Sequence, residues 1–88
     1  MTERDAQIVN QLGLHARPAA QLVRAAASFA CDIRLEKDGM EVNGKSIMGV
    51  MMLAAECGSM VRVRADGPDE AEAVAALCAL IAEGFGES

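Results

Sequence analysis

Residues 60–66 read MVRVRAD, and apolar and charged side chains alternate along this stretch. In an extended chain Val61, Val63 and Ala65 point to one side, and the arginines between them point to the other. The alternation predicts a strand that is buried on one face and solvated on the other. Sheets with one solvated face are commonly antiparallel, so we expect an antiparallel sheet.

Three other segments complete the predicted sheet. Residues 31–37, CDIRLEK, alternate in the same way. The Asp-Gly pair at 38–39 is typical of hairpin turns, and residues 40–42 then form a short return strand. Residues 6–9 are interpreted as the end of a first strand.

Three helices are predicted around these strands. Apolar residues recur at helical spacing over residues 19–30, and Pro18 suits the first turn, where its missing N–H costs nothing. Ser46 is a favoured N-cap for a short apolar helix over residues 47–53. A last helix opens with GPDE at residues 67–70 and ends at one of the glycines near the C-terminus.

The resulting order of elements is β-α-β-β-α-β-α. It predicts a single domain over residues 1–88, of the α+β class. We expect an open-faced β-sandwich, in which a four-stranded antiparallel sheet is covered on one face by three helices. A chain of 88 residues can build one modest core and little else.

Charge and composition exclude several classes of function. The formal net charge is −5, whereas nucleic acids and acidic membrane surfaces attract basic proteins. Phe29 and Phe85 are the only aromatic residues, which is too few for a platform that stacks bases. We therefore expect neither a nucleic acid nor a membrane as a partner.

The cysteines and the N-terminus indicate the compartment. The three cysteines form no CxxC pair and lie in apolar runs, so Cys31, Cys57 and Cys78 are interpreted as buried thiols of a reducing compartment. The N-terminus has no signal-peptide pattern, and no stretch is apolar enough to span a bilayer. A cytoplasmic location is expected.

The one histidine, His15, lies in the segment GLHARP, at the junction of a loop and a helix. A helix start offers unpaired N–H groups and a partial positive charge, which favour an anion. Arg17 adds a planar fork of donors suited to phosphate oxygens, and neutral imidazole is a competent nucleophile. The alternative is a surface histidine that only caps a helix. With no second histidine or clustered cysteines, we expect neither a metal nor another cofactor.

Residues 39–46, GMEVNGKS, match the GxxxxGKS pattern of nucleotide-binding loops, but we expect no such site there. Residues 40–42 alternate as a strand rather than a loop. Nucleotide-binding loops of this kind also need a parallel sheet with long crossovers. A chain of 88 residues with four amphipathic strands has no room for one.

Two stretches resemble signatures of one known family. Residues 10–20, NQLGLHARPAA, are similar to the active-site signature of HPr, the histidine-containing phosphocarrier family of the bacterial phosphotransferase system. Residues 43–53, NGKSIMGVMML, are similar to that family's regulatory serine segment, and the spacing between His15 and Ser46 also matches. The resemblance covers the whole chain in length and in element order.

The resemblance implies a phosphoryl carrier rather than an enzyme. Enzyme I, charged by phosphoenolpyruvate, would donate its phosphoryl group to Nδ1 of His15. His15 would then pass the group to an enzyme IIA domain. Ala16 and Arg17 would bind the phosphate, and Arg17 would neutralise its charge during transfer.

The resemblance also implies regulation and docking on the second helix. Ser46 would be phosphorylated by an HPr kinase/phosphorylase, although its position alone is equally typical of a helix N-cap. Ile47, Met48 and Met51 would form a docking surface, and flexible methionine side chains suit a surface that binds several partners. Plain core packing is the alternative for some of these residues, because a helix needs an inner face.

Other functions stay open at this point. The chain could be a purely regulatory interaction module controlled by Ser46, or a small ligand-binding regulatory domain, for which no pocket signature is present. The presence of both His15 and Arg17 favours the carrier. The acidic charge and the GFGES tail suggest the family's nitrogen-linked branch, whereas the Ser46 segment suggests the sugar-transport branch. We expect a monomer, because a carrier must shuttle between partners.

Overall fold

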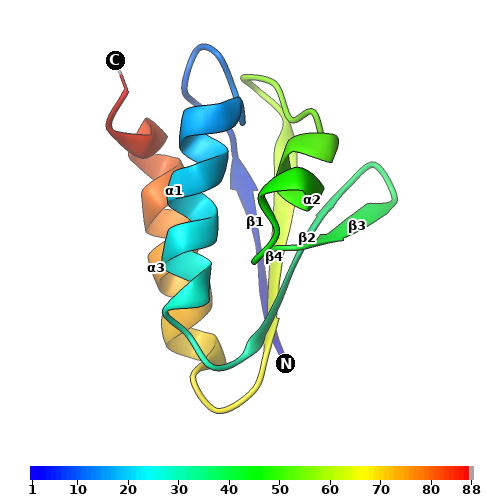
Figure 1. Ribbon diagram of the computed structural model, residues 1–88, viewed down its shortest axis with the longest axis vertical. Helices are drawn as coiled ribbons and strands as arrows, with labels where there is room; N and C mark the ends of the chain where they lie inside the picture. Colours follow the sequence, from blue (N-terminus) through cyan, green and yellow to red (C-terminus); the bar gives the residue numbers. More distant parts are fainter. Residues whose placement is uncertain (88) are drawn as a thin grey trace.

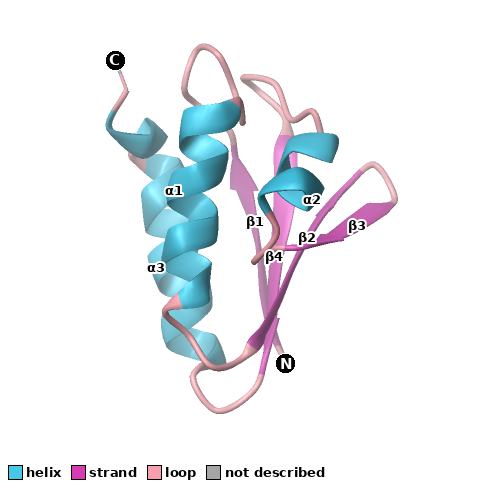
Figure 2. Cartoon of the chain, in the orientation of Figure 1, coloured by secondary structure: helices cyan, strands magenta, loops and turns pink. Residues whose placement is uncertain are grey.

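The computed structural model describes residues 1–87 and confirms the predicted order of elements. Four strands form one antiparallel sheet in the order β1-β4-β2-β3. The helices cover one face of the sheet, and α1 and α3 run alongside each other (Figure 1, Figure 2). The elements are β1 (Thr2–Gln7), α1 (Ala16–Ala27), β2 (Asp32–Lys37), β3 (Met40–Asn43), α2 (Ile47–Met52), β4 (Met60–Asp66), α3 (Glu70–Ala82) and the short 3-10 helix η1 (Gly84–Gly86).

The core lies between the sheet and the helices. Ala6 of β1 is opposite Val61 of β4, and Leu35 of β2 is opposite Val63, so apolar side chains line up on the inner face. Burial of this apolar surface is the main favourable contribution to folding in a small chain. The large side chains that are fully buried include Ile8, Leu22, Ile33, Leu35, Val50, Val61, Val63, Val74, Leu77 and Ile81.

The other face of the sheet carries charged side chains. The Arg64 guanidinium lies 2.9 Å from Glu3, 3.3 Å from Glu36 and 2.7 Å from Glu41, which come from β1, β2 and β3. Exposed ion pairs of this kind contribute little stability individually. Their charge keeps this side of the sheet in water, as the predicted open-faced sandwich requires.

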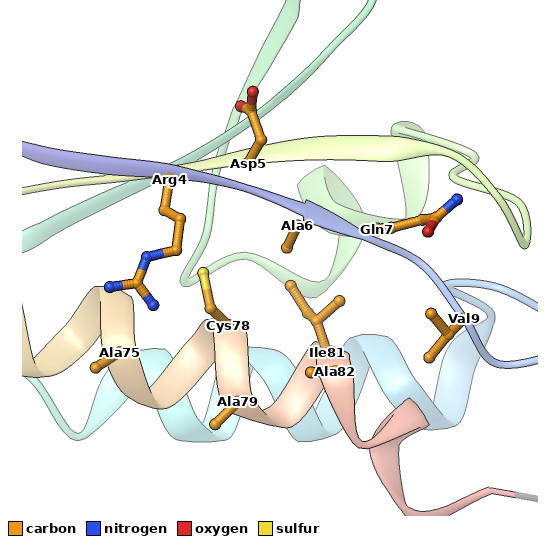
Figure 3. A pocket seen from close by; sticks show the side chains of 10 residues that line it. All are labelled: Arg4, Asp5, Ala6, Gln7, Val9, Ala75, Cys78, Ala79, Ile81 and Ala82. Carbon is orange, nitrogen blue, oxygen red and sulfur yellow. The ribbon is translucent and has the colours of Figure 1, made fainter.

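The first strand begins and ends earlier than predicted, at Thr2 and Gln7 rather than near Val9. The sequence of β1 does not show a regular alternation of apolar residues, because Arg4 occupies a position on the side that faces the helices. Figure 3 shows Arg4 and Cys78 on the walls of an open hollow of about 460 Å³ between β1 and α3. Because β1 is an edge strand, an inward-pointing charge there discourages pairing with another chain.

The first helix also ends earlier than predicted, at Ala27 instead of Ala30. The Asp69 carboxylate, at the start of α3, accepts the backbone N–H of Ala30 at 2.8 Å and that of Cys31 at 2.9 Å. These two bonds draw the chain out of the helix and into β2. They also hold the pKa of Asp69 below its usual value, chiefly through the bond from Ala30.

The cysteines do not share one environment. Cys31 and Cys78 are buried, and burial raises the pKa of both thiols. Cys57 is exposed, so the prediction of three buried thiols is wrong. It lies in a turn that backbone bonds fix, including one of 2.7 Å from the Gly58 N–H to the Ile8 carbonyl, and the apolar run around it is therefore a surface loop.

Candidate functional site

The loop before α1 is held in one shape by Asn10 and Gly13. The buried Asn10 side chain donates from Nδ2 to the Gly13 carbonyl at 2.7 Å, and the Gly13 N–H donates to the Asn10 carbonyl at 3.1 Å. Gly13 has a φ of +69°, and a Cβ there would clash with the Ala55 carbonyl oxygen, so glycine is required. The Leu14 N–H donates to that same oxygen at 2.9 Å. These contacts set the position at which His15 leaves the loop.

His15 occupies the N-cap position of α1 but does not cap it. Its carbonyl accepts the first helical bond, from the Ala19 N–H at 3.0 Å, while its side chain makes no capping bond. Because Pro18 has no N–H, the N–H groups of Ala16 and Arg17 are the remaining donors of the first turn without a helical acceptor. Two such donors at the positive end of a 12-residue helix favour the binding of an anion.

The His15 imidazole is held by a carboxylate from the other end of the chain. The side chain is 35% exposed, and its Nε2 lies 3.0 Å from Oε2 and 3.3 Å from Oε1 of Glu87. A carboxylate only accepts, so in the neutral ring Nε2 carries the proton and Nδ1 keeps the lone pair. No residue from 1 to 87 hydrogen-bonds to Nδ1. The contact thus leaves the lone pair of Nδ1 without a partner among these residues.

Glu87 reaches His15 through a left-handed turn after α3. Gly84, Phe85 and Gly86 have φ angles of 64°, 58° and 75°, and this conformation is strained for Phe85. The Phe85 side chain is buried, so core packing holds the strained residue in place. Sequence reasoning missed Glu87, because it lies 72 positions from His15 and only the two glycines indicate a turn. Ser88, the last residue of the tail, lies outside the described residues.

Arg17 is exposed and forms no ion pair with any residue between 1 and 87. It lines an open hollow of about 520 Å³ beside the Glu87 contact, together with Gln11 and Gln21. The hollow therefore presents amide and guanidinium donors, and Glu87, which contacts the imidazole, also lines it. Leu12, which is 72% exposed, forms an apolar part of its lining and was not singled out from the sequence.

Ser46 caps α2 as predicted, because its Oγ accepts the Gly49 N–H at 3.1 Å. Val50 is the residue of α2 that enters the core, so core packing applies to it and not to the predicted docking residues. The helix α2 packs against α1 (Figure 1). The docking residues are 45%, 76% and 43% exposed, in the order Ile47, Met48 and Met51.

Other kinds of site find no support in the part of the chain that the structure describes. Residues 1–87 contain no cluster of metal-ligating side chains, and no helix among them is long and apolar enough to cross a membrane. In the GxxxxGKS segment, Met40–Asn43 form β3, which pairs with β2 in antiparallel fashion. Asp38 and Gly39 form the hairpin turn, with φ angles of 52° and 83°. The segment is therefore a hairpin and not a phosphate-binding loop.

Comparisons with known proteins agree with this geometry. Residues 2–83 match the family model described as "PTS HPr component phosphorylation site". This chain belongs to the HPr family. The phosphocarrier protein HPr of Cupriavidus necator is 54% identical over 87 residues, which is 99% of this chain and 98% of that protein. The chain is accordingly an HPr phosphocarrier of the phosphotransferase system and not an enzyme.

Solved HPr structures share the fold. The HPr-C-His protein of Thermoanaerobacter tengcongensis has a TM-score of 0.96 and 49% identity, with 100% of this chain and 99% of that chain covered. HPr of Bacillus anthracis has a TM-score of 0.88 and 46% identity, with 91% and 95% covered. The α+β arrangement of sheet and helices is therefore that of HPr.

Proposed function

We propose that His15 is the residue on which this HPr carries its phosphoryl group. Phosphorylated enzyme I, charged from phosphoenolpyruvate, is the donor, and an enzyme IIA domain is the acceptor. The observation that carries the proposal is the start of α1. No residue from 1 to 87 hydrogen-bonds to Nδ1 there, and the N–H groups of Ala16 and Arg17 have no helical acceptor. Phosphoryl transfer depends mainly on positioning and charge neutralisation, and these groups supply both.

The transfer is an in-line displacement at phosphorus. Nδ1 of His15 forms a bond to phosphorus as the bond between phosphorus and the donor breaks, and the electron pair of that bond stays with the donor. The N–H groups of Ala16 and Arg17 bind phosphate oxygens, and the Arg17 guanidinium neutralises their charge. The same groups act when the phosphoryl group leaves for enzyme IIA.

Ser46 is the proposed site of regulation, with an HPr kinase/phosphorylase as its enzyme. Its hydroxyl lies at the start of α2, next to the exposed side chains of Ile47, Met48 and Met51, which form the proposed docking surface. A phosphate there would add negative charge to that surface and weaken the docking of enzyme I. The carrier would act as a monomeric single domain in the cytoplasm.

The carrier role is tested by intact-mass measurement after incubation with enzyme I and phosphoenolpyruvate. We expect an acid-labile gain of one phosphate in the wild type and no gain in His15→Ala. Thermal unfolding of the variant should match the wild type within the range of ordinary surface substitutions, about 0.5 kcal/mol, because His15 lies outside the core. A folded His15→Ala protein that still gains the label would contradict the assignment.

A further inference from the structure

We infer that Glu87 and Asn10 are positioning residues for phosphoryl transfer, an inference that rests on the proposed role of His15. The three side chains form one continuous chain of hydrogen bonds. Nδ2 of Asn10 donates to Oε1 of Glu87 at 3.0 Å, and Nε2 of His15 lies 3.0 Å from Oε2 of the same carboxylate. The carboxylate therefore joins a buried amide to the imidazole.

The buried end of this chain is rigid. Asn10 is 3% exposed, and its Nδ2 divides its two protons between the Gly13 carbonyl at 2.7 Å and Glu87 at 3.0 Å. Its Oδ1 has no partner among residues 1–87, and a buried unpaired oxygen lowers stability. The reversed amide would place that oxygen against two other oxygens, so both acceptors require the orientation observed. Asn10 thus presents a fixed donor to the carboxylate.

Glu87, the middle residue of this hydrogen-bond chain, is anchored by the turn after α3. The buried Phe85 fixes η1, and the Glu87 N–H donates to the Gly84 carbonyl at 3.0 Å. The backbone of this turn and the Asn10 amide hold Glu87 from two directions. The carboxylate in turn fixes the plane of the His15 ring, whose other nitrogen is the nucleophile.

The chemistry of transfer gives the carboxylate a second effect. When Nδ1 bonds to phosphorus, the ring gains positive charge that is shared with Nε2–H, while the proton itself stays on Nε2. A charge-assisted hydrogen bond to Glu87 stabilises this cationic ring. When the phosphoryl group leaves, the electron pair returns to Nδ1 and the ring is neutral again. No proton moves in either direction, so the carboxylate acts by position and charge alone.

The inference is tested first on unphosphorylated protein with ¹⁵N-labelled histidine, which needs no phosphoryl donor. In the wild type we expect a His15 Nε2–H signal that exchanges slowly with solvent. Glu87→Ala should abolish that signal, and Glu87→Gln should weaken it, because its amide oxygen can still accept. The control is Glu83→Gln, which removes an exposed acidic residue just before the same turn and should change nothing.

The rate of phosphoryl acceptance from enzyme I gives the second readout. We expect acceptance by Glu87→Ala to be about tenfold slower, and that by Glu87→Gln about threefold slower, since a neutral hydrogen bond is roughly half as strong as a charge-assisted one. Glu83→Gln should match the wild type. Because Asn10 acts through Glu87, Asn10→Ala alone should slow phosphoryl acceptance. Added to Glu87→Ala in a double variant, it should cause no further slowing. Thermal unfolding checks that the Asn10 variants fold, and the Glu87 variants decide the question if they do not.

Three outcomes would overturn the inference. A Glu87→Gln protein that accepts phosphate faster than the wild type would show that the carboxylate repels the incoming group instead of aiding it. An unchanged Nε2–H signal in Glu87→Ala, or an unchanged rate, would show that the hydrogen-bond chain has no role, while the carrier function would stand. A wild type that shows the slowly exchanging signal but takes no phosphate would overturn the carrier function, and the inference with it.

Discussion

The starts of α1 and α2 use the same helical geometry in opposite ways. At α1 the N-cap residue, His15, leaves the first N–H groups free, and its ring is held by a residue from the far end of the chain. At α2 the N-cap residue, Ser46, accepts the Gly49 N–H at 3.1 Å and so satisfies the helix itself. In the function proposed above, the start of α1 serves a ligand, whereas the start of α2 serves stability. Substitutions at the start of α1 should therefore change phosphoryl transfer, and substitutions at the start of α2 should change the free energy of unfolding.

The largest effect is expected at the open start. Arg17→Ala removes a guanidinium that forms no ion pair with residues 1–87, so the free energy of unfolding should not change. Phosphoryl transfer should become slower, because the phosphate loses its proposed partner. Loss of one or two charge-assisted hydrogen bonds to phosphate predicts a decrease of about 10- to 100-fold in single-turnover rate. Arg24→Ala, on an exposed position of the same helix, is the control and should transfer normally. Equal rates for the two variants would remove Arg17 from the site.

The closed start should show the reverse behaviour. Ser46→Ala removes a capping bond and should lower the free energy of unfolding by about 1 kcal/mol, while His15 phosphorylation stays near the wild-type rate. Ser46→Asp keeps a favoured cap but adds a negative charge beside the docking surface, so it should keep the stability and slow acceptance from enzyme I. Chemical unfolding and the transfer assay distinguish the two variants. A stable Ser46→Ala protein would mean that the observed cap contributes nothing.

The start of α3 sharpens the contrast, because the carboxylate of its first residue, Glu70, is already bound by other groups of the protein. Bonds from the Thr2 hydroxyl, the N-terminal ammonium and the Gly67 N–H lower the pKa of Glu70 to about 2, against 4.5 for a free glutamate. This stabilisation is present above pH 4.5 and is lost as the pH falls through about 2. Glu70→Gln should therefore lower Tm at neutral pH and have little effect near pH 2. Glu72→Gln, an exposed acidic residue in the same turn, should leave Tm unchanged at both.

Much of the fold could be predicted because its signals are local. The alternation in β2 and β4 places every second side chain in the core, and the Asp38-Gly39 turn and the Ser46 cap follow from neighbouring residues. The limits of β1 and α1 could not be predicted in the same way. They depend on a charged residue facing the helices, Arg4, and on backbone bonds to Asp69, which lies 39 residues from Ala30.

The residues of the candidate site also differ in whether local sequence identifies them. His15, Arg17 and Ser46 lie in continuous motifs, so their sequence neighbours identify them. Glu87 lies outside these motifs, and the motif that contains Asn10 does not reveal what its side chain binds. The connection of both residues to the imidazole exists only after α3 brings the C-terminal turn back to the loop before α1. The exposure of Cys57 was missed for a related reason, since an apolar sequence does not show which loop its residues will occupy.

The most direct test of the account is the amide NMR spectrum of the protein before and after phosphorylation by enzyme I. If the free donors at the start of α1 hold the phosphate, the N–H signals of Ala16 and Arg17 should move further than any others, and downfield, while that of Gly49 should stay in place. Large shifts at Gly49 with unmoved signals at Ala16 and Arg17 would contradict the account, because they would place the phosphate at the closed helix start instead of the open one.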